Sequence, residues 1–167
     1  MAGTYEKVTE RVIYAYKFDG ARSAAGTLAQ ALDAAPPYLP TNTILVPVPT
    51  APARIRQRGY DQTLLLAKEL AKLRGLNVVH CLERQHDLRQ VGSGRKQRQQ
   101  QAKSAFRLKK RQAEKIKGKP VLLIDDVLTT GATLSAAAEL LYAAGSMALN
   151  AAVVAWQLPP ELKEISS

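Results

Sequence analysis

Two adjacent acids, Asp125 and Asp126, follow an uninterrupted apolar run over residues 121–124 and precede a stretch rich in threonine. The apolar run is typical of a strand that is buried on both faces of a parallel sheet. Residues 129–133 are typical of a turn that opens a helix, where free N–H groups and the helix dipole favour phosphate. The carboxylates can accept hydrogen bonds from a vicinal diol or hold a hydrated Mg²⁺. Diol acceptors beside a phosphate cradle suit a 5-phosphorylated ribose.

The residue types of this turn support the same interpretation. Thr129, Thr130 and Thr133 add hydroxyl donors, and Gly131 lets the backbone approach a ligand closely. The structural alternative is an ordinary Thr-Gly helix cap after two strand-end acids. That alternative leaves the two acids without an evident structural purpose.

The rest of the pattern predicts the elements that position these residues. Helices are expected over residues 4–17, 21–35, 61–73 and 133–144, and strands over residues 44–48, 76–79, 121–124 and 148–154. Asp61 is expected to cap the third helix and Gly75 to end it, and a proline-rich stretch after residue 48 predicts a turn-rich loop. Strands that alternate with helices predict an α/β fold with a parallel sheet, whose strand carboxyl ends bind ligands.

Positive charge is concentrated in the middle of the chain. Residues 54–119 hold 19 Lys and Arg against five Asp and Glu, a net of +14, whereas the rest has five against nine, a net of −4. Such an excess marks either a solvated face or a surface for the phosphates of a small ligand or a nucleic acid. Only Tyr60 and Phe106 are aromatic in this stretch, which weakens the case for a base-stacking platform. The composition of residues 83–112 predicts a long mobile loop, the excursion, that is partly helical.

The length and composition of the chain exclude several other classes of protein. The 167 residues suit one domain, expected over residues 1–158 with a polar tail at 159–167. Cys81, the single cysteine, cannot form an intrachain disulfide or, with only two histidines, a structural zinc site, and we expect it to be a small buried side chain. His80 and His86 suit core or surface roles. No apolar run approaches the length of a membrane span, and the N-terminus has no signal region, so we expect a cytoplasmic protein without membrane insertion.

Three motifs carry a resemblance to a known family. The string over residues 121–133 resembles the ribose-phosphate signature of type I phosphoribosyltransferases, in which an apolar strand precedes paired acids, Val, Thr-Thr-Gly and Thr. A second motif is similar to the signature of the ComF family and consists of Val46-Pro47-Val48-Pro49, Pro52, Arg54 and Arg58-Gly59-Tyr60-Asp61-Gln62. A third agrees with that family and consists of Leu82, Arg84, Gln90, Arg98, Gln101-Ala102 and Ala105-Phe106. The resemblance covers roughly residues 5–155.

The sequence departs from the family pattern in two respects. Asp61 and Gln101 stand where the family usually has Asn, which changes the local hydrogen bonding. Longer members begin with a cysteine-rich zinc module, and this sequence starts at the segment that would follow it. We therefore expect the zinc module to be absent.

The resemblance implies a type I phosphoribosyltransferase-like parallel sheet flanked by helices, with a small N-terminal helical hood at about residues 4–40. It implies phosphoribosyl pyrophosphate with Mg²⁺ as the donor, whose pyrophosphate a nucleophile displaces. Asp125 and Asp126 would be the catalytic pair, would hold the ribose hydroxyls and could also contact Mg²⁺. The 5-phosphate site would be Thr129, Thr130, Gly131, Ala132 and Thr133. Arg54 and Arg58 would bind pyrophosphate, solvated loop arginines being the alternative. The excursion would be a flexible loop over the donor, with Arg84, Arg95 and Arg98.

Three functions follow from the resemblance as alternatives. The first is a ComF-like donor-binding protein in natural competence, which handles incoming single-stranded DNA together with proteins of the competence machinery. The second is an active nucleobase phosphoribosyltransferase in nucleotide salvage. The third is a regulatory protein that binds the donor without turning it over. A homodimer is a common expectation for this fold.

Overall fold

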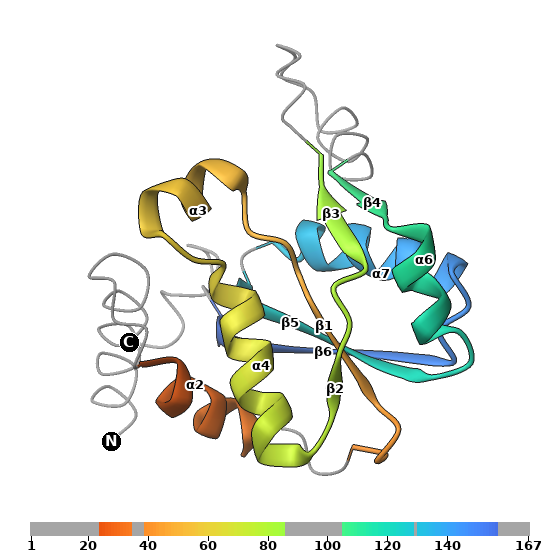
Figure 1. Cartoon of the computed structure of the whole chain (residues 1–167), viewed down its shortest axis with the longest axis horizontal. Helices are drawn as coiled ribbons and strands as arrows, with labels where there is room; N and C mark the ends of the chain where they lie inside the picture. The colour runs from red at the N-terminus through yellow and green to blue at the C-terminus, as the bar shows by residue number, and fades with distance from the viewer. Residues whose placement is uncertain (1–23, 35–38, 86–104, 129, 157–167) are drawn as a thin grey trace, which may run out of the picture.

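The structure is a computed structural model that describes residues 24–34, 39–85, 105–128 and 130–156, and its ribbon is shown in Figure 1. The helices are α2 (Ala24–Asp33), α3 (Pro52–Arg58), α4 (Gln62–Arg74), α6 (Lys110–Ala113), the 3₁₀ turn η1 (Glu114–Ile116) and α7 (Ala132–Ala143). The strands are β1 (Ile44–Pro47), β2 (Asn77–Val78), β3 (Leu82–Arg84), β4 (Phe106–Leu108), β5 (Pro120–Leu128) and β6 (Ala148–Trp156). The helix expected over residues 4–17 and the tail at 159–167 lie outside the described residues.

Four strands form one parallel sheet in the order β2-β1-β5-β6. Ile44 of β1 lies opposite Val121 of β5, and β5 pairs with β6 from Pro120 opposite Ala148 onward. The strands β3 and β4 form a separate antiparallel pair. The parallel sheet with connecting helices confirms the α/β prediction.

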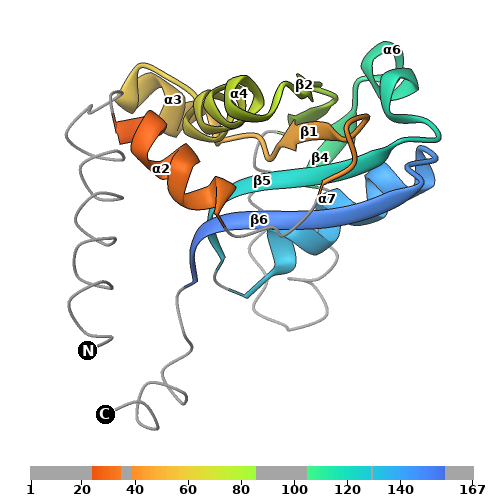
Figure 2. The ribbon, with the colours of Figure 1, turned by 90° about the horizontal axis from the view of Figure 1, so that it is seen from below.

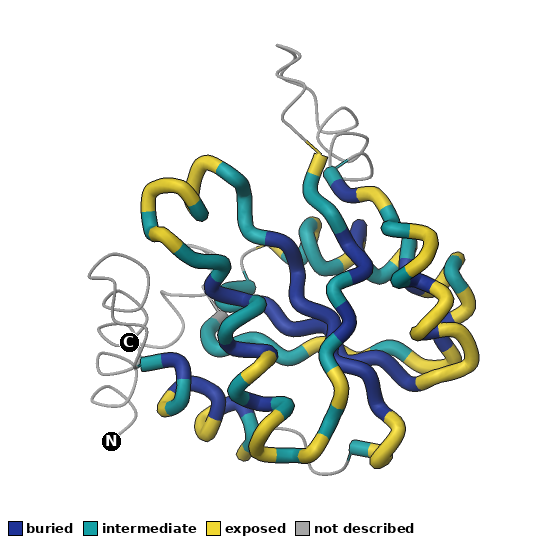
Figure 3. Tube along the Cα trace, in the orientation of Figure 1, coloured by how far each residue is buried: buried dark blue, intermediate teal, exposed yellow. Residues whose placement is uncertain are grey.

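Helices cover both faces of the sheet. Figure 2 shows α2 and α4 on one face and α7 on the other. The strands alternate between the two cores, because successive side chains of a strand point to opposite faces. The core under α7 takes in Val46, Val121 and Leu123, and the core under α2 and α4 takes in Leu45 and Leu122. The central strands β1 and β5 are therefore largely dark blue in Figure 3. Because these strands are buried on both faces, the positions of their carboxyl ends are fixed.

The best predicted helix is α4. The Asp61 carboxylate caps it by accepting a hydrogen bond from the Leu64 N–H at 3.2 Å. Gly75 ends it with φ of 65°, a left-handed conformation in which glycine avoids Cβ strain. The face of α4 that packs on the sheet is apolar, with Leu66, Ala67 and Leu70 fully buried. Both predicted ends of this helix are confirmed.

Three predictions differ from the structure. The strand expected over residues 121–124 continues through both aspartates to Leu128, because β6 pairs with it that far. Residues 52–58 form α3 rather than an irregular loop, since Pro52 at the first helical position is preset for a helix and Gly59 ends it with φ of 78°. The described ends of the excursion over residues 83–112 are the strands β3 and β4, followed by α6.

Candidate functional site

The carboxyl end of β5 places the two aspartates beside the loop that follows β1. Asp125 is 9% exposed, and its Oδ1 accepts a hydrogen bond from the Asp126 N–H at 2.8 Å. The Asp126 side chain is half-buried. The Val48 N–H donates to the Ile124 carbonyl at 2.9 Å, so the β1 loop leaves the sheet next to the acids. Adjacent carboxyl ends of parallel strands form the edge at which α/β proteins bind ligands.

The turn from β5 to α7 has the backbone of an anion cradle. Gly131 caps α7 with φ of 75°, and its carbonyl accepts the Ser135 N–H at 2.9 Å. The Ala132 N–H faces Thr130 Oγ1 at 3.5 Å. The first amides of a helix have no carbonyl partner within the helix, and the dipole there favours negative charge. The 5-phosphate site at this turn stays a prediction, and Thr129 lies outside the described residues.

The helix α3 brings arginine to the same edge. Arg58 donates a hydrogen bond to Gln62 Oε1 at the start of α4. Burial and the neighbouring Arg54 lower the pKa of Arg58, and the charges of Asp126 and Tyr60 oppose that shift. Arg54 is exposed on the same helix.

A hydrogen-bond network fixes the loop after β1 to the start of α4. The Thr50 hydroxyl donates to Asp61 Oδ1 at 3.0 Å, and Thr63 Oγ1 lies 2.5 Å from the Val48 carbonyl oxygen. Asp61 stands where the family usually has Asn, and its Oδ1 accepts as an amide oxygen would, so the cap survives the difference. The sequence reasoning missed Thr50 and Thr63. The position of Thr50 between Pro49 and Pro52 is the signal that marks it.

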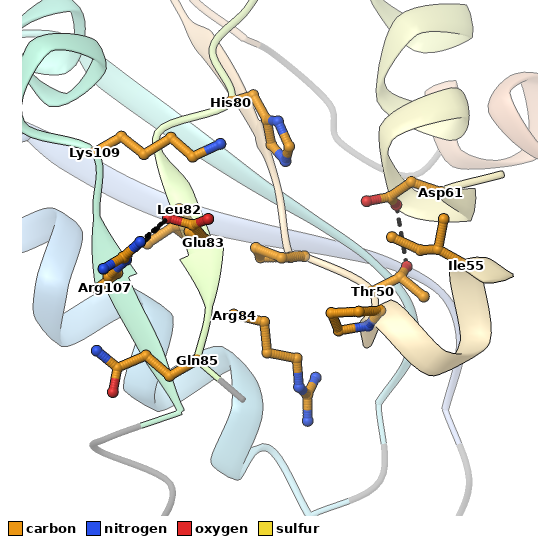
Figure 4. Close-up of a pocket in the computed structure, with 12 residues that line it drawn as sticks. Thr50, Ile55, Asp61, His80, Leu82, Glu83, Arg84, Gln85, Arg107 and Lys109 are labelled. Atoms are coloured by element: carbon orange, nitrogen blue, oxygen red, sulfur yellow. Dashed lines mark hydrogen bonds and ion pairs between the residues drawn. The ribbon is translucent and has the colours of Figure 1, made fainter. Parts of the chain in front are cut away.

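A pocket of about 520 Å³ lies between α3 and the β3–β4 pair, as Figure 4 shows. Its walls are Pro49, Thr50, Pro52, Ile55, Asp61, His80, Leu82, Glu83, Arg84, Gln85, Arg107 and Lys109. The Arg84 guanidinium lies 5.6 Å from the centre of the Phe106 ring, in a cation–π contact. Of the three arginines predicted for a flexible loop, Arg84 is thus at the pocket, whereas Arg95 and Arg98 lie outside the described residues.

The charged groups of the pocket shift one another's pKa values. The hydrogen bond and charge of Arg107 lower the pKa of Glu83, whose Oε2 lies 2.9 Å from Arg107 Nε. Burial lowers the pKa of His80, Lys109 lowers it further, and Asp61 and Glu83 act in the opposite direction. His80 is half-buried at the pocket, whereas the sequence predicts only a core or surface role for it.

Cys81 is fully buried, as the sequence predicts. Burial raises the pKa of its thiol to about 11. A buried thiol of this kind remains protonated at neutral pH, so it is a packing residue rather than a nucleophile.

The phosphoribosyl transferase domain family matches residues 62–164. This chain belongs to that family. Competence protein ComFC of Bacillus subtilis (strain 168) is 31% identical over 118 residues, which span 66% of this chain and 43% of ComFC. The chain thus spans less than half of the length of this curated relative. Together, the two matches confirm a ComF-like type I phosphoribosyltransferase domain.

Two solved structures share the fold. Glutamine phosphoribosylpyrophosphate amidotransferase from Bacillus subtilis, complexed with ADP and GMP, superposes with a TM-score of 0.55 at 16% identity, over 80% of this chain and 26% of that chain. Adenine phosphoribosyltransferase from Thermoanaerobacter pseudethanolicus gives a TM-score of 0.52 at 15% identity, over 84% of each chain. At these identities the likeness establishes the type I phosphoribosyltransferase fold.

In the described part of this phosphoribosyltransferase domain, no helix has the length and apolar character needed to cross a membrane. Within the described ranges, no group of three or more His, Cys, Asp or Glu side chains could hold a metal ion.

Proposed function

We propose that this chain binds phosphoribosyl pyrophosphate with Mg²⁺ at the carboxyl edge of the sheet. The carrying observation is the buried Asp125 and its neighbour Asp126 at the carboxyl end of β5, directly before the turn into α7. The hydrogen bond from the Val48 N–H to the Ile124 carbonyl brings the loop that leads to α3 beside them, which supports a site built from carboxylates, helix amides and arginines at one edge. A donor with a pyrophosphate, a ribose diol and a 5-phosphate presents three groups that complement these features.

Different residues of this edge bind different groups of the donor. Asp125 and Asp126 accept hydrogen bonds from the ribose hydroxyls, and the backbone amides from Gly131 to Thr133 hold the 5-phosphate. Arg54 and Arg58 donate to the pyrophosphate, because α3 follows directly on the loop after β1. The network around Asp61 keeps that loop in place, so the arginines are held near the donor before it binds.

The residues present fit Mg²⁺ as a partner of the donor. Two adjacent carboxylates and no larger ligand cluster in the described ranges suit an ion that keeps several waters and binds mainly substrate phosphates. When bound, Mg²⁺ would act as a template and neutralise charge on the pyrophosphate. Asp125 and Asp126 are the side chains that would contact it, directly or through water.

An active nucleobase phosphoribosyltransferase is the second candidate, and the shared fold with adenine phosphoribosyltransferase favours it. In that reaction a nucleobase nitrogen bonds to the anomeric carbon, and the carbon–oxygen bond to pyrophosphate breaks. Pyrophosphate leaves with the bonding pair, and the nitrogen loses its proton. Arg54 and Arg58 would stabilise the charge that develops on the leaving group.

For the cellular role, we propose that the chain acts in natural competence on incoming single-stranded DNA, in the cytoplasm. The similarity to ComFC supports a role in competence, and the net charge of +14 over residues 54–119 supports a polyanionic partner. Partner proteins of the competence machinery belong to the same proposal.

Calorimetric titration with phosphoribosyl pyrophosphate tests the donor site. Saturable binding is expected with Mg²⁺ and should be lost in EDTA, whereas no heat with Mg²⁺ would overturn the proposal. A panel of nucleobases added to the same sample then separates the candidates. Pyrophosphate release with one base and its loss in Asp125→Asn identify an enzyme; binding without release for any base identifies a donor-binding protein.

A further inference from the structure

The amino end of β5 carries a second charged surface, distant from the aspartates. Residues 107–119 contain one acid, Glu114, among seven basic residues. Five of the basic side chains lie on α6, on η1 and in the turn into β5, and all five are exposed: Lys110, Arg111, Lys115, Lys117 and Lys119. Figure 3 shows much of this end of the molecule as exposed. The surface is thus open and strongly positive.

The last turn of α7 adds an aromatic side chain beside these cations. Tyr142 is 70% exposed, and its carbonyl accepts the Gly145 N–H at 2.9 Å. The Gly145 carbonyl in turn accepts the Gly118 N–H at 2.8 Å, and a Cβ on Gly145 would lie 3.3 Å from Lys117 Cγ. The backbone of Tyr142 is therefore linked through Gly145 to the turn that carries Lys117 and Lys119, although Tyr142 lies outside the basic stretch of the sequence.

A second exposed apolar side chain belongs to the same region. Met147 is 64% exposed, and its N–H donates to the Lys119 carbonyl at 2.9 Å. Tyr142 and Met147 therefore add exposed aromatic and apolar side chains to an end of the molecule that carries clustered cations. We name the surface formed by Lys110, Arg111, Lys115, Lys117, Lys119, Tyr142 and Met147 the β5 amino-end surface.

We propose that the β5 amino-end surface binds single-stranded nucleic acid. Lysine and arginine neutralise backbone phosphates and release counterions, and an exposed ring stacks on bases without regard to sequence. The combination favours a single strand over a duplex, because bases in a duplex are not free to stack on a protein ring. The proposal rests on the nucleic-acid part of the proposed function and is independent of donor binding.

The two ligands would not compete for space. Pro120 begins β5 and Asp125 lies five residues further along, roughly 17 Å away at about 3.3 Å per residue. The donor edge and the β5 amino-end surface are therefore at opposite ends of the same strand. Substitutions at one end should leave binding at the other end unchanged.

The first test is the affinity for a fluorescent oligo-dT of about 20 nucleotides at low salt, measured by anisotropy. Tyr142→Ala should weaken binding about five- to tenfold, because the stacked ring is lost. Tyr142→Phe keeps the ring and should bind as the wild type does. Both substitutions are at an exposed position, and the Phe variant separates stacking from any structural role of the residue.

The second test is the salt dependence of the same binding. The double variant Lys117→Gln/Lys119→Gln should lower the slope of log affinity against log salt by about 1.4, at roughly 0.7 for each phosphate contact. The matched control is Lys68→Gln/Lys72→Gln, which removes two exposed lysines from α4 and should leave the slope unchanged.

The outcomes separate this proposal from the proposed function. If the wild type, Tyr142→Ala and the lysine variant bind the oligonucleotide equally well, the proposal for the β5 amino-end surface is overturned. DNA would then bind at another part of the molecule. If the wild type does not bind the oligonucleotide at low salt, both the β5 amino-end surface and the proposed role on DNA are overturned. The result of the donor titration does not depend on this outcome. A concentration-dependent dimer that Tyr142→Ala dissociates, without effect on oligonucleotide affinity, would assign the surface to self-association and also overturn the proposal.

Discussion

The two ends of β5 use charge in different ways. At the carboxyl end, the aspartates follow a buried strand, and hydrogen bonds from the Val48 N–H to Ile124 and from the Thr50 hydroxyl to Asp61 hold the neighbouring loop. At the amino end, lysines and arginines are exposed on short elements, with Glu114 as the one acid in residues 107–119.

The difference indicates two kinds of ligand. Charges of both signs in a fixed arrangement complement a small molecule whose charged groups have fixed positions. Exposed charges of one sign attract a polyanion through counterion release and need no fixed geometry. We therefore propose that the basic residues at the two ends of β5 serve different ligands, and that only the donor requires the carboxylates.

The largest expected effect is on the donor. Asp125→Asn removes the charge from a buried carboxylate with little change of shape, and the affinity for phosphoribosyl pyrophosphate with Mg²⁺ should fall about 30- to 100-fold, since hydrogen bonds to charged groups contribute about 1.5–3 kcal/mol each. Calorimetry measures the loss. Glu114→Gln makes the same exchange at the other end of β5 and should leave donor affinity unchanged; equal losses in both variants would remove the distinction between the two ends.

Arg58→Lys should weaken donor binding about tenfold. Lysine keeps the charge but loses the forked donor geometry that matches a phosphate. Arg56→Lys is the control, because Arg56 is exposed on the same helix. Unchanged affinity in Arg58→Lys would show that α3 contributes charge without a specific contact.

Asp61→Ala should lower the free energy of unfolding by about 1 kcal/mol, because α4 loses its N-cap. The bond from Thr50 is lost as well. Asp61→Asn keeps an oxygen that accepts from the Leu64 N–H and should cost much less. Urea unfolding measures both variants. An Asn variant as unstable as the Ala variant would mean that the carboxylate charge, not the cap, is required.

The smallest effect concerns pH. Burial and Lys109 lower the pKa of His80 below its usual 6.5, so the unfolded chain takes up the proton first as the pH falls. The free energy of unfolding should therefore decrease below about pH 6.5, by less than the cost of Asp61→Ala. His80→Gln should flatten this part of the profile; a profile identical to that of the wild type would assign the decrease to other groups.

The sequence predicted the elements whose signals are local. The cap at Asp61, the glycine at position 75 and the apolar run before Asp125 depend on neighbours in the chain, and each is confirmed. The helix α3 is not predicted, because the proline-rich stretch after residue 48 indicates a turn-rich loop, although Pro52 stands at the position where proline starts a helix.

Features that depend on distant pairing could not be predicted. The strand β5 continues through two residues of poor strand propensity because β6 pairs beside it. The strands β3 and β4 have three residues each, which is too short for a recognisable alternation of apolar and polar residues. They are also far apart in the sequence, so their pairing is not a local signal. The backbone of Tyr142 is linked to the basic stretch through the hydrogen bonds of Gly145, a connection between distant parts of the chain. The sequence, with only Tyr60 and Phe106 as aromatic residues over positions 54–119, therefore weakens the case for a base-stacking platform without considering Tyr142.

Hydrogen–deuterium exchange with and without phosphoribosyl pyrophosphate and Mg²⁺ tests the central claim most directly. Amides at the start of α7 and in the loop after β1 are expected to exchange more slowly when the donor is bound, while amides of residues 113–119 exchange at the same rate. Protection at residues 113–119 without protection at the start of α7 would contradict the placement of the donor at the carboxyl end of β5.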